Sequence, residues 1–366
     1  MGADAELHGA GHDALNPGHL AGEPASPLPG PRGTDPTGIY RVRDGIYAGD
    51  LLIAAIAEFD FFSWVAGRQP DLAGICTGLG IRARPADVMC TLFTAMGLIE
   101  RDGARFDVTD LAAAHLIAGS PFDMREYVAM LRDRPGCREL VQVLRTGEPP
   151  GWSGDPGSQE WAKEMEQQGF ASGFTSAMDA RGGYLAPALA ASLDLRGSAG
   201  VLDVAGGSGV YAFAIVERFP HLRAAVLERP PVDGVARQRI EQRGYAGRVG
   251  VISADMFADP LPEGYDVHLF SHVLHDWDEP EVRRLLASSF ASLPAGGMVV
   301  DNDAHLEADK SGPLPVAQYS VLLMRLTRGR CWSTSELGSM LTETGFTDVA
   351  VVPTAVDRSV MTARKP

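Results

Sequence analysis

The chain has 366 residues, of which 47 are acidic and 32 basic, so its formal net charge at pH 7 is −15. A protein this negative is not expected to bind a nucleic-acid backbone or an anionic membrane surface. Its four cysteines lack the spacing of a zinc site or disulfide framework, no apolar run approaches the ~20 residues of a membrane span, and the first residues lack the pattern of a signal peptide. We therefore expect a cytoplasmic protein with reduced thiols.

Residues 1–36 are rich in Gly, Pro, Ala and His, and include the proline-rich run from Pro24 to Pro31. A segment of this composition cannot bury enough apolar surface to fold, and we predict a disordered tail. Its three separated histidines are interpreted as solvated side chains and not as a metal site: His8, His12 and His19.

Residues 37–118 combine helical patterns with a hairpin. The stretch from Ala48 to Val65 is strongly apolar, and a later helix is predicted from Pro85 to Leu98, after a glycine turn. Residues Ile99 to Thr109 then flank an Asp-Gly pair, which is typical of a tight turn between two strands. Helix, turn, helix and hairpin in this order predict a winged-helix domain.

A winged helix raises the alternative of a DNA-binding regulator. The helix that would enter the groove, Pro85 to Leu98, contains no Lys or Arg and little that could pair with base edges or phosphates. Its exposed face is apolar, so we expect it to bury against protein. DNA binding is the disfavoured interpretation.

The region 119–366 is predicted to be an α/β unit with connecting helices and a doubly wound parallel sheet. A strand from Val201 ends near Asp203 and breaks into a loop with three glycines, Gly206, Gly207 and Gly209, before a helix from Tyr211. Glycines at a helix start let backbone N–H groups approach a ligand closely. The spacing matches neither the dinucleotide nor the triphosphate loop, and an Asp ahead of it suits a cationic amino-acid head group.

Polar residues also end the next three predicted strands. Glu228 ends the second strand, where a carboxylate can accept hydrogen bonds from both hydroxyls of a ribose. Asp255 and Met256 follow the third strand and could meet an adenine amino group and its ring. The fourth strand, from Val267, leads to Ser271 and then to His275. These residues predict one ligand crevice along the carboxyl edge of the sheet.

Together, the Asp-x-x-Gly-Gly-x-Gly loop, the acidic end of the second strand, the Asp-Met-Phe segment and the His275-Asp-Trp motif resemble class I S-adenosylmethionine-dependent methyltransferases. The likeness is to the caffeate-type and bacterial small-molecule O-methyltransferase family, and it covers the chain from about Gly38 to Pro366. It implies a Rossmann-like catalytic domain, a winged-helix dimerisation domain, a homodimer, and S-adenosylmethionine as cofactor. The implied acceptor is a small aromatic natural-product precursor.

The resemblance also implies roles for individual residues. His275 is the general base, which suits an imidazole whose unperturbed pKa is about 6.5, and Asp303, six positions beyond Gly297, orients it. His272 matches no catalytic position. The cofactor is held by Asp203, Gly206, Gly207, Gly209, Glu228, Asp255, Met256 and Ser271, and the acceptor pocket includes Phe174, Met178, Arg181 and Arg325.

Two departures from the family pattern leave the accepting atom open. Cys331 and Trp332 stand where a second orienting acidic residue is expected. Arg325 stands where some C-methylating members carry a metal-binding histidine, so we expect no metal, although His275, Asp276 and His305 could form an irregular site. Oxygen is the first choice and an electron-rich or enolisable carbon the alternative. An inactive methyltransferase-like scaffold is disfavoured because the loop and the His-Asp-Trp motif are intact.

Overall fold

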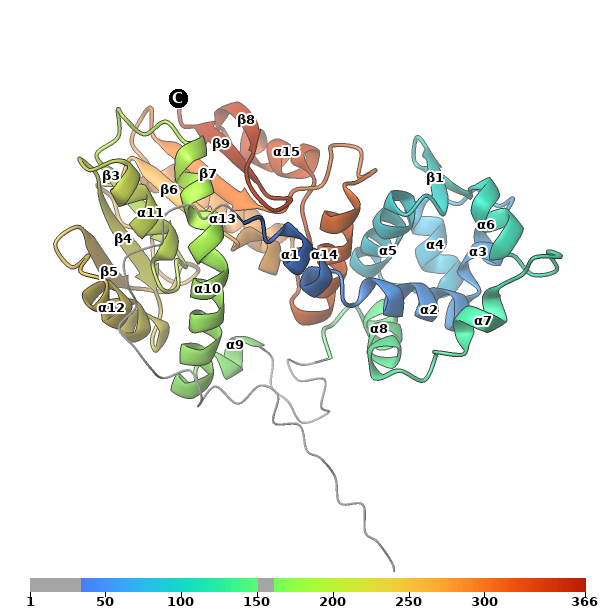
Figure 1. Ribbon diagram of the computed structural model, residues 1–366. Coiled ribbons are helices and arrows are strands. Elements are labelled where there is room, and N and C mark those ends of the chain that lie inside the picture. The colour runs from blue at the N-terminus through green and yellow to red at the C-terminus, as the bar shows by residue number, and fades with distance from the viewer. Residues whose placement is uncertain (1–33, 151–160) are drawn as a thin grey trace, which may run out of the picture.

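The computed structural model describes residues 34–150 and 161–366, which form a helical unit and a sheet unit side by side (Figure 1). The tail expected over 1–36 lies outside the described residues except for its last three, and so do His8, His12 and His19. No described helix has both the length and the apolar character needed to cross a bilayer.

The helical unit follows the predicted order of elements. The apolar stretch from Ala48 to Val65 is interrupted at Asp60, whose φ of 43° ends one helix and begins the next. The hairpin turns at Gly103, which has a φ of 58°. The elements are α1 (Thr37–Asp44), α2 (Ala48–Phe59), α3 (Phe61–Val65), α4 (Leu72–Leu79), α5 (Ala83–Ala95), β1 (Ile99–Asp102), β2 (Arg105–Val108), α6 (Asp110–His115), α7 (Arg125–Ala129) and α8 (Pro135–Thr146).

The helical unit extends beyond residue 118, where the sequence analysis placed a domain boundary. Both α7 and α8 pack against α2. A helix from the far end of the chain, α14 (Leu314–Leu326), joins the same core, where its Val316 and Leu322 are buried together with Leu51 and Phe93. Because α5 packs along α14, the apolar face of α5 is covered by protein and is not free to enter a DNA groove.

The sheet has seven strands in the order β5-β4-β3-β6-β7-β9-β8. The first five run parallel, while β9 is antiparallel to β7 and β8 is antiparallel to β9. All four strands predicted from the sequence are present. The bounds are β3 (Gly200–Val204), β4 (Arg223–Glu228), β5 (Val249–Ser253), β6 (Val267–Ser271), β7 (Met298–Asp303), β8 (Thr347–Pro353) and β9 (Ser359–Arg364).

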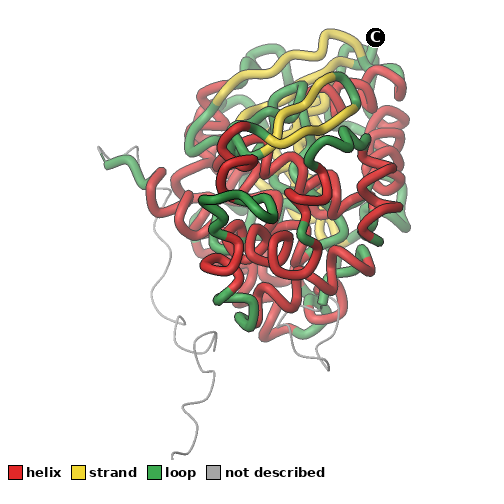
Figure 2. The backbone as a smooth tube through the Cα atoms, turned by 90° about the vertical axis from the view of Figure 1, so that its right-hand side faces the viewer, coloured by secondary structure: helices red, strands yellow, loops and turns green. Residues whose placement is uncertain are grey.

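Helices cover both faces of the sheet, which explains why every residue of β3 and β6 is buried. One layer contains α10 (Gln168–Ser192), α11 (Val210–Arg218) and α12 (Val232–Gln242). The other contains α13 (Glu279–Ser292) and α15 (Thr334–Thr344). Seen from the side of the helical unit, helices lie in front of much of the seven-stranded sheet (Figure 2).

Candidate active site

A cavity opens at the carboxyl ends of β3, β4 and β6 and is walled by α10 and α14. Most of the side chains and glycines that the sequence pointed to line it together, although they come from segments far apart in the chain. These are Phe174, Met178, Arg181, Gly206, Gly207, Glu228, Asp255, Met256, Ser271 and His275. Four others do not line it: Asp203, Gly209, Asp303 and Arg325.

Asp203 and Gly209 do not line the cavity but determine the conformation of the glycine loop. Asp203 is fully buried in β3, and a Cβ atom on Gly206 would overlap its carboxyl group. Both of its oxygens lack a hydrogen-bond partner in the described part of the chain, and burial together with the charge of Glu228 raises the pKa of Asp203 to about 8. Gly209 begins α11 with a φ of 83°, and a Cβ there would lie 3.1 Å from Val226.

Glu228 joins the loop to the neighbouring strand. Its carboxylate accepts hydrogen bonds from the N–H of Gly207 at 3.0 Å and of Arg229 at 3.2 Å. Burial raises the pKa of Glu228 to about 7, although these two hydrogen bonds oppose the rise. Further along the rim, the Asp255 carboxylate is fixed by the N–H of Phe257 at 2.8 Å.

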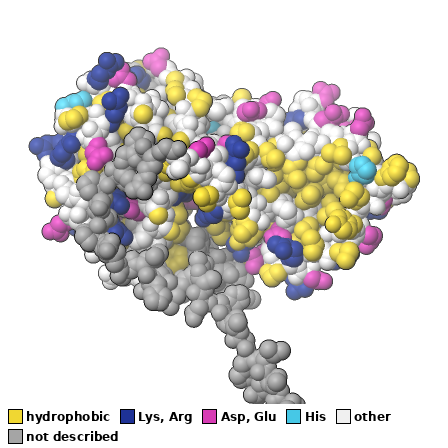
Figure 3. Space-filling model, viewed as in Figure 1, with side chains coloured by type: hydrophobic (Ala, Val, Ile, Leu, Met, Phe, Trp, Pro, Cys, Tyr) yellow, Lys and Arg dark blue, Asp and Glu magenta, His cyan; other side chains and the backbone are white. Residues whose placement is uncertain are grey.

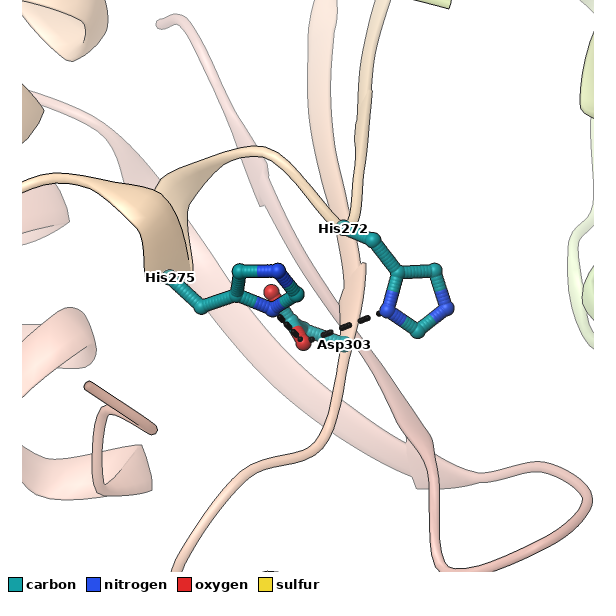
Figure 4. A group of neighbouring side chains, drawn as sticks. All are labelled: His272, His275 and Asp303. Carbon is teal, nitrogen blue, oxygen red and sulfur yellow. Dashed lines mark hydrogen bonds and ion pairs between the residues drawn. The ribbon is translucent and has the colours of Figure 1, made fainter. Parts of the chain in front are cut away.

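His275 lies in a short 3-10 turn, Leu274–Asp276, that follows β6. Its Nδ1 is 2.6 Å from Oδ1 of Asp303, the last residue of β7 (Figure 4). Burial would lower the pKa of His275, but the charges of Asp303 and Asp276 outweigh it, so the pKa lies above the ordinary value. Burial would raise the pKa of Asp303, but His275 and His272 hold it well below its ordinary range. The two form a buried hydrogen-bonded pair at the edge of the cavity, which becomes an ion pair when His275 is protonated.

The second carboxylate near His275 belongs to Asp276 of the His-Asp-Trp motif and not to a residue of the segment around Cys331. Oδ1 of Asp276 is 3.5 Å from Nε2 of His275, and burial raises the pKa of Asp276 to about 6. Trp332 instead supports the backbone of the turn, because its Nε1 donates to the carbonyl of Leu274 at 3.1 Å. The indole of Trp332 therefore supports this turn, at a position where the family resemblance implies an acidic residue.

His272 is a cavity residue that the sequence interpretation passed over. Its φ is 57°, its side chain is buried, and its Nδ1 is 3.5 Å from Oδ1 of Asp303, so Asp303 lies between two imidazoles (Figure 4). Burial and then the charge of Arg181 lower the pKa of His272 well below its ordinary value, which keeps the ring neutral. No local pattern marks such a residue, because its position depends on the pairing of β6 with β7.

Metal-binding atoms come together here, but in a different set from the one the sequence allowed. His272, His275 and Asp303 each place one such atom within 4.8 Å of the others. The 2.6 Å between His275 and Asp303 is a hydrogen-bond distance, shorter than the ~3 Å between two ligands bound at about 2.1 Å to one ion. His305 is engaged elsewhere, with Asp301 at 2.8 Å and Ser359 at 2.7 Å.

Helix α14 supplies a wall that the sequence did not reveal, through Tyr319, Leu322, Leu323 and Leu326. Arg325, on the same helix, points away from the cavity. Its Nε donates to Glu139 at 2.6 Å and its guanidinium lies over the ring of Tyr47 at 4.5 Å. Arg325 thus joins α14 to the helical unit and does not line the cavity, where the sequence analysis expected it.

Comparisons with known proteins match most of this chain. A profile of the O-methyltransferase domain matches residues 138–347. The 3-hydroxy-5-methyl-1-naphthoate 3-O-methyltransferase of Streptomyces sahachiroi is 36% identical over 326 residues, which are 88% of this chain and 92% of that protein. The structure of an O-methyltransferase family 2 protein from Planctomyces limnophilus, in complex with apigenin, has 30% identity and a TM-score of 0.82, covering 93% of this chain and 99% of its own. Human N-acetylserotonin methyltransferase, solved with S-adenosylmethionine, shares the fold at 21% identity and a TM-score of 0.58, covering 90% of this chain and 96% of its own.

Proposed function

This chain belongs to the O-methyltransferase family of S-adenosylmethionine-dependent enzymes, and on that premise we propose that it methylates a hydroxyl oxygen of a small aromatic natural-product precursor. The observation that carries the proposal is the His275–Asp303 pair, which lies at the same cavity as the glycine loop and Glu228. A hydroxynaphthoate is the acceptor named for the relative from S. sahachiroi, and a hydroxylated fused-ring acceptor is our proposal here.

The residues present fit the cofactor. Gly206 and Gly207 leave their backbone open to the cavity. The Asp203 carboxyl beneath them has a pKa of about 8, and the charge of a bound ammonium group would lower this pKa, so that the ionised carboxylate would stabilise the ammonium group. Glu228 would hold the ribose hydroxyls, and Asp255 with Met256 the adenine. Ser271, at the end of β6 and bonded to Asn302 at 2.8 Å, completes this side. When bound, S-adenosylmethionine supplies a methyl group activated by a sulfonium.

The protein's own contribution is proton transfer and alignment. His275 accepts the proton that the acceptor hydroxyl loses, and the negative charge of Asp303 stabilises the resulting imidazolium. Phe174 and Met178 on α10 face α14 across the cavity and would hold the aromatic ring in line.

Asp303→Asn tests the pairing through the pH dependence. The unprotonated imidazole is the active form, so kcat/KM of the wild type should rise with pH through an inflection above 6.5. Without the Asp303 charge, the effect of burial on the pKa of His275 dominates, and the inflection should move to lower pH. The maximal rate should fall by about 10²-fold. The measurement is a pH profile of kcat/KM, with the exposed Asp309→Asn as control. An inflection that stays in place contradicts the pairing.

Glu228→Gln tests the ribose assignment. Loss of a carboxylate acceptor should raise the Kd of S-adenosylhomocysteine by about 10- to 100-fold. The wild-type affinity should also weaken as pH falls below about 7, because the carboxyl of Glu228 protonates there, while the variant should show no such dependence. Calorimetry across this pH range measures both, with the exposed Glu263→Gln as control. Equal affinity in variant and wild type would discredit the assignment.

Product NMR tests the accepting atom. The enzyme is offered a naphthol and an electron-rich arene without a hydroxyl, together with S-adenosylmethionine. Oxygen methylation predicts a methyl ether from the naphthol and no product from the arene. A new carbon-bound methyl group would assign the carbon alternative and overturn the oxygen proposal.

The helical unit acts, in our proposal, as a winged-helix dimerisation domain. Large apolar side chains are exposed on and near α7, among them Phe122 at 67%, Tyr127 at 72% and Met130 at 76%. They belong to the helical unit, over which Figure 3 shows an extensive apolar surface. Apolar patches of this kind mark protein interfaces.

The double variant Tyr127→Asp, Met130→Asp is expected to convert the homodimer to a monomer, because it places charge in the apolar contact. Light scattering after size exclusion measures the mass. The double variant Val351→Asp, Val352→Asp on the exposed strand β8 is the control, since it adds the same two charges away from α7. A wild type that runs as a monomer would rule the interface out.

A further inference from the structure

Three side chains at the cavity carry buried polar atoms that have no hydrogen-bond partner in the described part of the chain. They are Nε of Arg181, the hydroxyl of Tyr211 and Nε2 of His272, whose other ring nitrogen, Nδ1, lies 3.5 Å from Oδ1 of Asp303. They come from α10, from α11 and from the residue after β6. Other unpartnered buried atoms in residues 34–150 and 161–366 belong to side chains that do not line the cavity. Unmet donors gathered on one wall indicate a ligand group that would satisfy them.

The charges around Arg181 indicate the sign of the charge on that ligand group. Arg181 has no carboxylate within ion-pair distance among the described residues, and its Nη1 reaches only the hydroxyl of Tyr319, at 3.4 Å. The neighbouring charges are already paired, because Arg358 binds Asp44 at 2.8 Å and Asp303 binds His275 at 2.6 Å. A buried guanidinium without a counter-charge is costly, so an anionic ligand would be stabilised here.

The other two groups are neutral donors. Burial raises the pKa of Tyr211 to about 12, so its hydroxyl keeps its proton. The neutral ring of His272 has one N–H, and in the tautomer that carries this hydrogen on Nε2 it can donate to the ligand. A guanidinium flanked by two neutral donors matches the two oxygens of a carboxylate.

The position of the cluster favours the acceptor over the cofactor as the source of that carboxylate. The rings of His272 and of Tyr319, which holds Arg181, each lie 5.7 Å from the ring of His275. Glu228, which would hold the ribose, ends β4, and Asp255, which would hold the adenine, follows β5, so both lie on the other side of the glycine loop. We propose that Arg181, Tyr211 and His272 form a carboxylate-binding subsite that selects acceptors with a carboxylate on the ring that carries the reacting hydroxyl. This inference rests on the proposed function.

Calorimetry on protein loaded with S-adenosylhomocysteine tests the subsite. The probes are 3-hydroxy-1-naphthoate and 2-naphthol, which lacks only the carboxylate. Wild type should bind the naphthoate about 10- to 100-fold more tightly, as charge-assisted hydrogen bonds predict. Arg181→Leu should bring this ratio close to one. Tyr211→Phe, which removes a single oxygen and keeps the packing, should lower it in part, and the exposed Arg196→Leu should preserve it.

Three results would overturn the subsite: equal wild-type affinities for the two probes, an unchanged ratio in Arg181→Leu, or variants that weaken S-adenosylhomocysteine binding while the ratio stays the same. The last result would assign the cluster to the carboxylate of the cofactor. The proposed function fails separately, if the wild type does not bind S-adenosylhomocysteine or methylates no hydroxyarene.

Discussion

His275→Ala should lower kcat by about 10³- to 10⁴-fold, at the upper end of what a general base contributes, while the Kd of S-adenosylhomocysteine stays close to that of the wild type. The imidazole of His275 lies at the cavity, and the buried carboxylate of Asp303, 2.6 Å away, raises its pKa. Its removal leaves the acceptor hydroxyl without a base but does not touch the loop or Glu228. Single-turnover kinetics and calorimetry on the same preparation separate the two effects.

The matched control is His221→Ala, because His221 is exposed and lies outside the cavity. It should leave both quantities unchanged. If His275→Ala turns over at a rate near that of the wild type, His275 is not the base. If it loses cofactor binding instead, its role is structural.

Gly206→Ala should have the second largest effect, a rise in the Kd of S-adenosylhomocysteine of about 100-fold. The new Cβ would overlap the carboxyl group of Asp203, which is fully buried in β3 and has no space to retreat. The loop must then shift and carry away the Gly207 N–H that Glu228 accepts at 3.0 Å. Overpacking of this kind costs about 1–3 kcal/mol, and the upper value corresponds to roughly 100-fold in affinity.

Gly197→Ala is the control, since a Cβ at Gly197 meets nothing within 4 Å. Thermal unfolding of both variants shows whether the fold survives, and calorimetry gives the affinity. An affinity of Gly206→Ala within a few-fold of the wild type would mean that the loop does not hold the cofactor.

Much of the sheet domain was predictable because its signals are local. Runs of buried apolar residues that end in glycine or a polar side chain identify β3 and β4, and parallel order then brings Asp203 and Glu228 to the same edge. Asp303 was reached through the family resemblance. The structure supplies the reason for its position, because β6 pairs with β7 and Ser271 lies opposite Asn302.

The part of the cavity wall that α14 provides could not be predicted from such local signals. Arg325 and Tyr319 lie on one helix, yet the first pairs with Glu139 in the helical unit and the second reaches Arg181 near the cavity. Helical periodicity marks α14 as a helix but does not say which face meets which neighbour. The same limit applies to α7 and α8, which the sequence grouped with the sheet domain and which pack on α2.

The sequence by itself determined the family, the position of the glycine loop and the identity of the candidate base, because each depends on short local motifs. Only the tertiary structure decided that Asp276 and not residue 331 is the second carboxylate beside His275, that His272 faces Asp303, and that α14 closes the cavity. These are contacts between side chains brought together by strand pairing and helix packing, and their geometry is fixed by the whole core and not by local spacing.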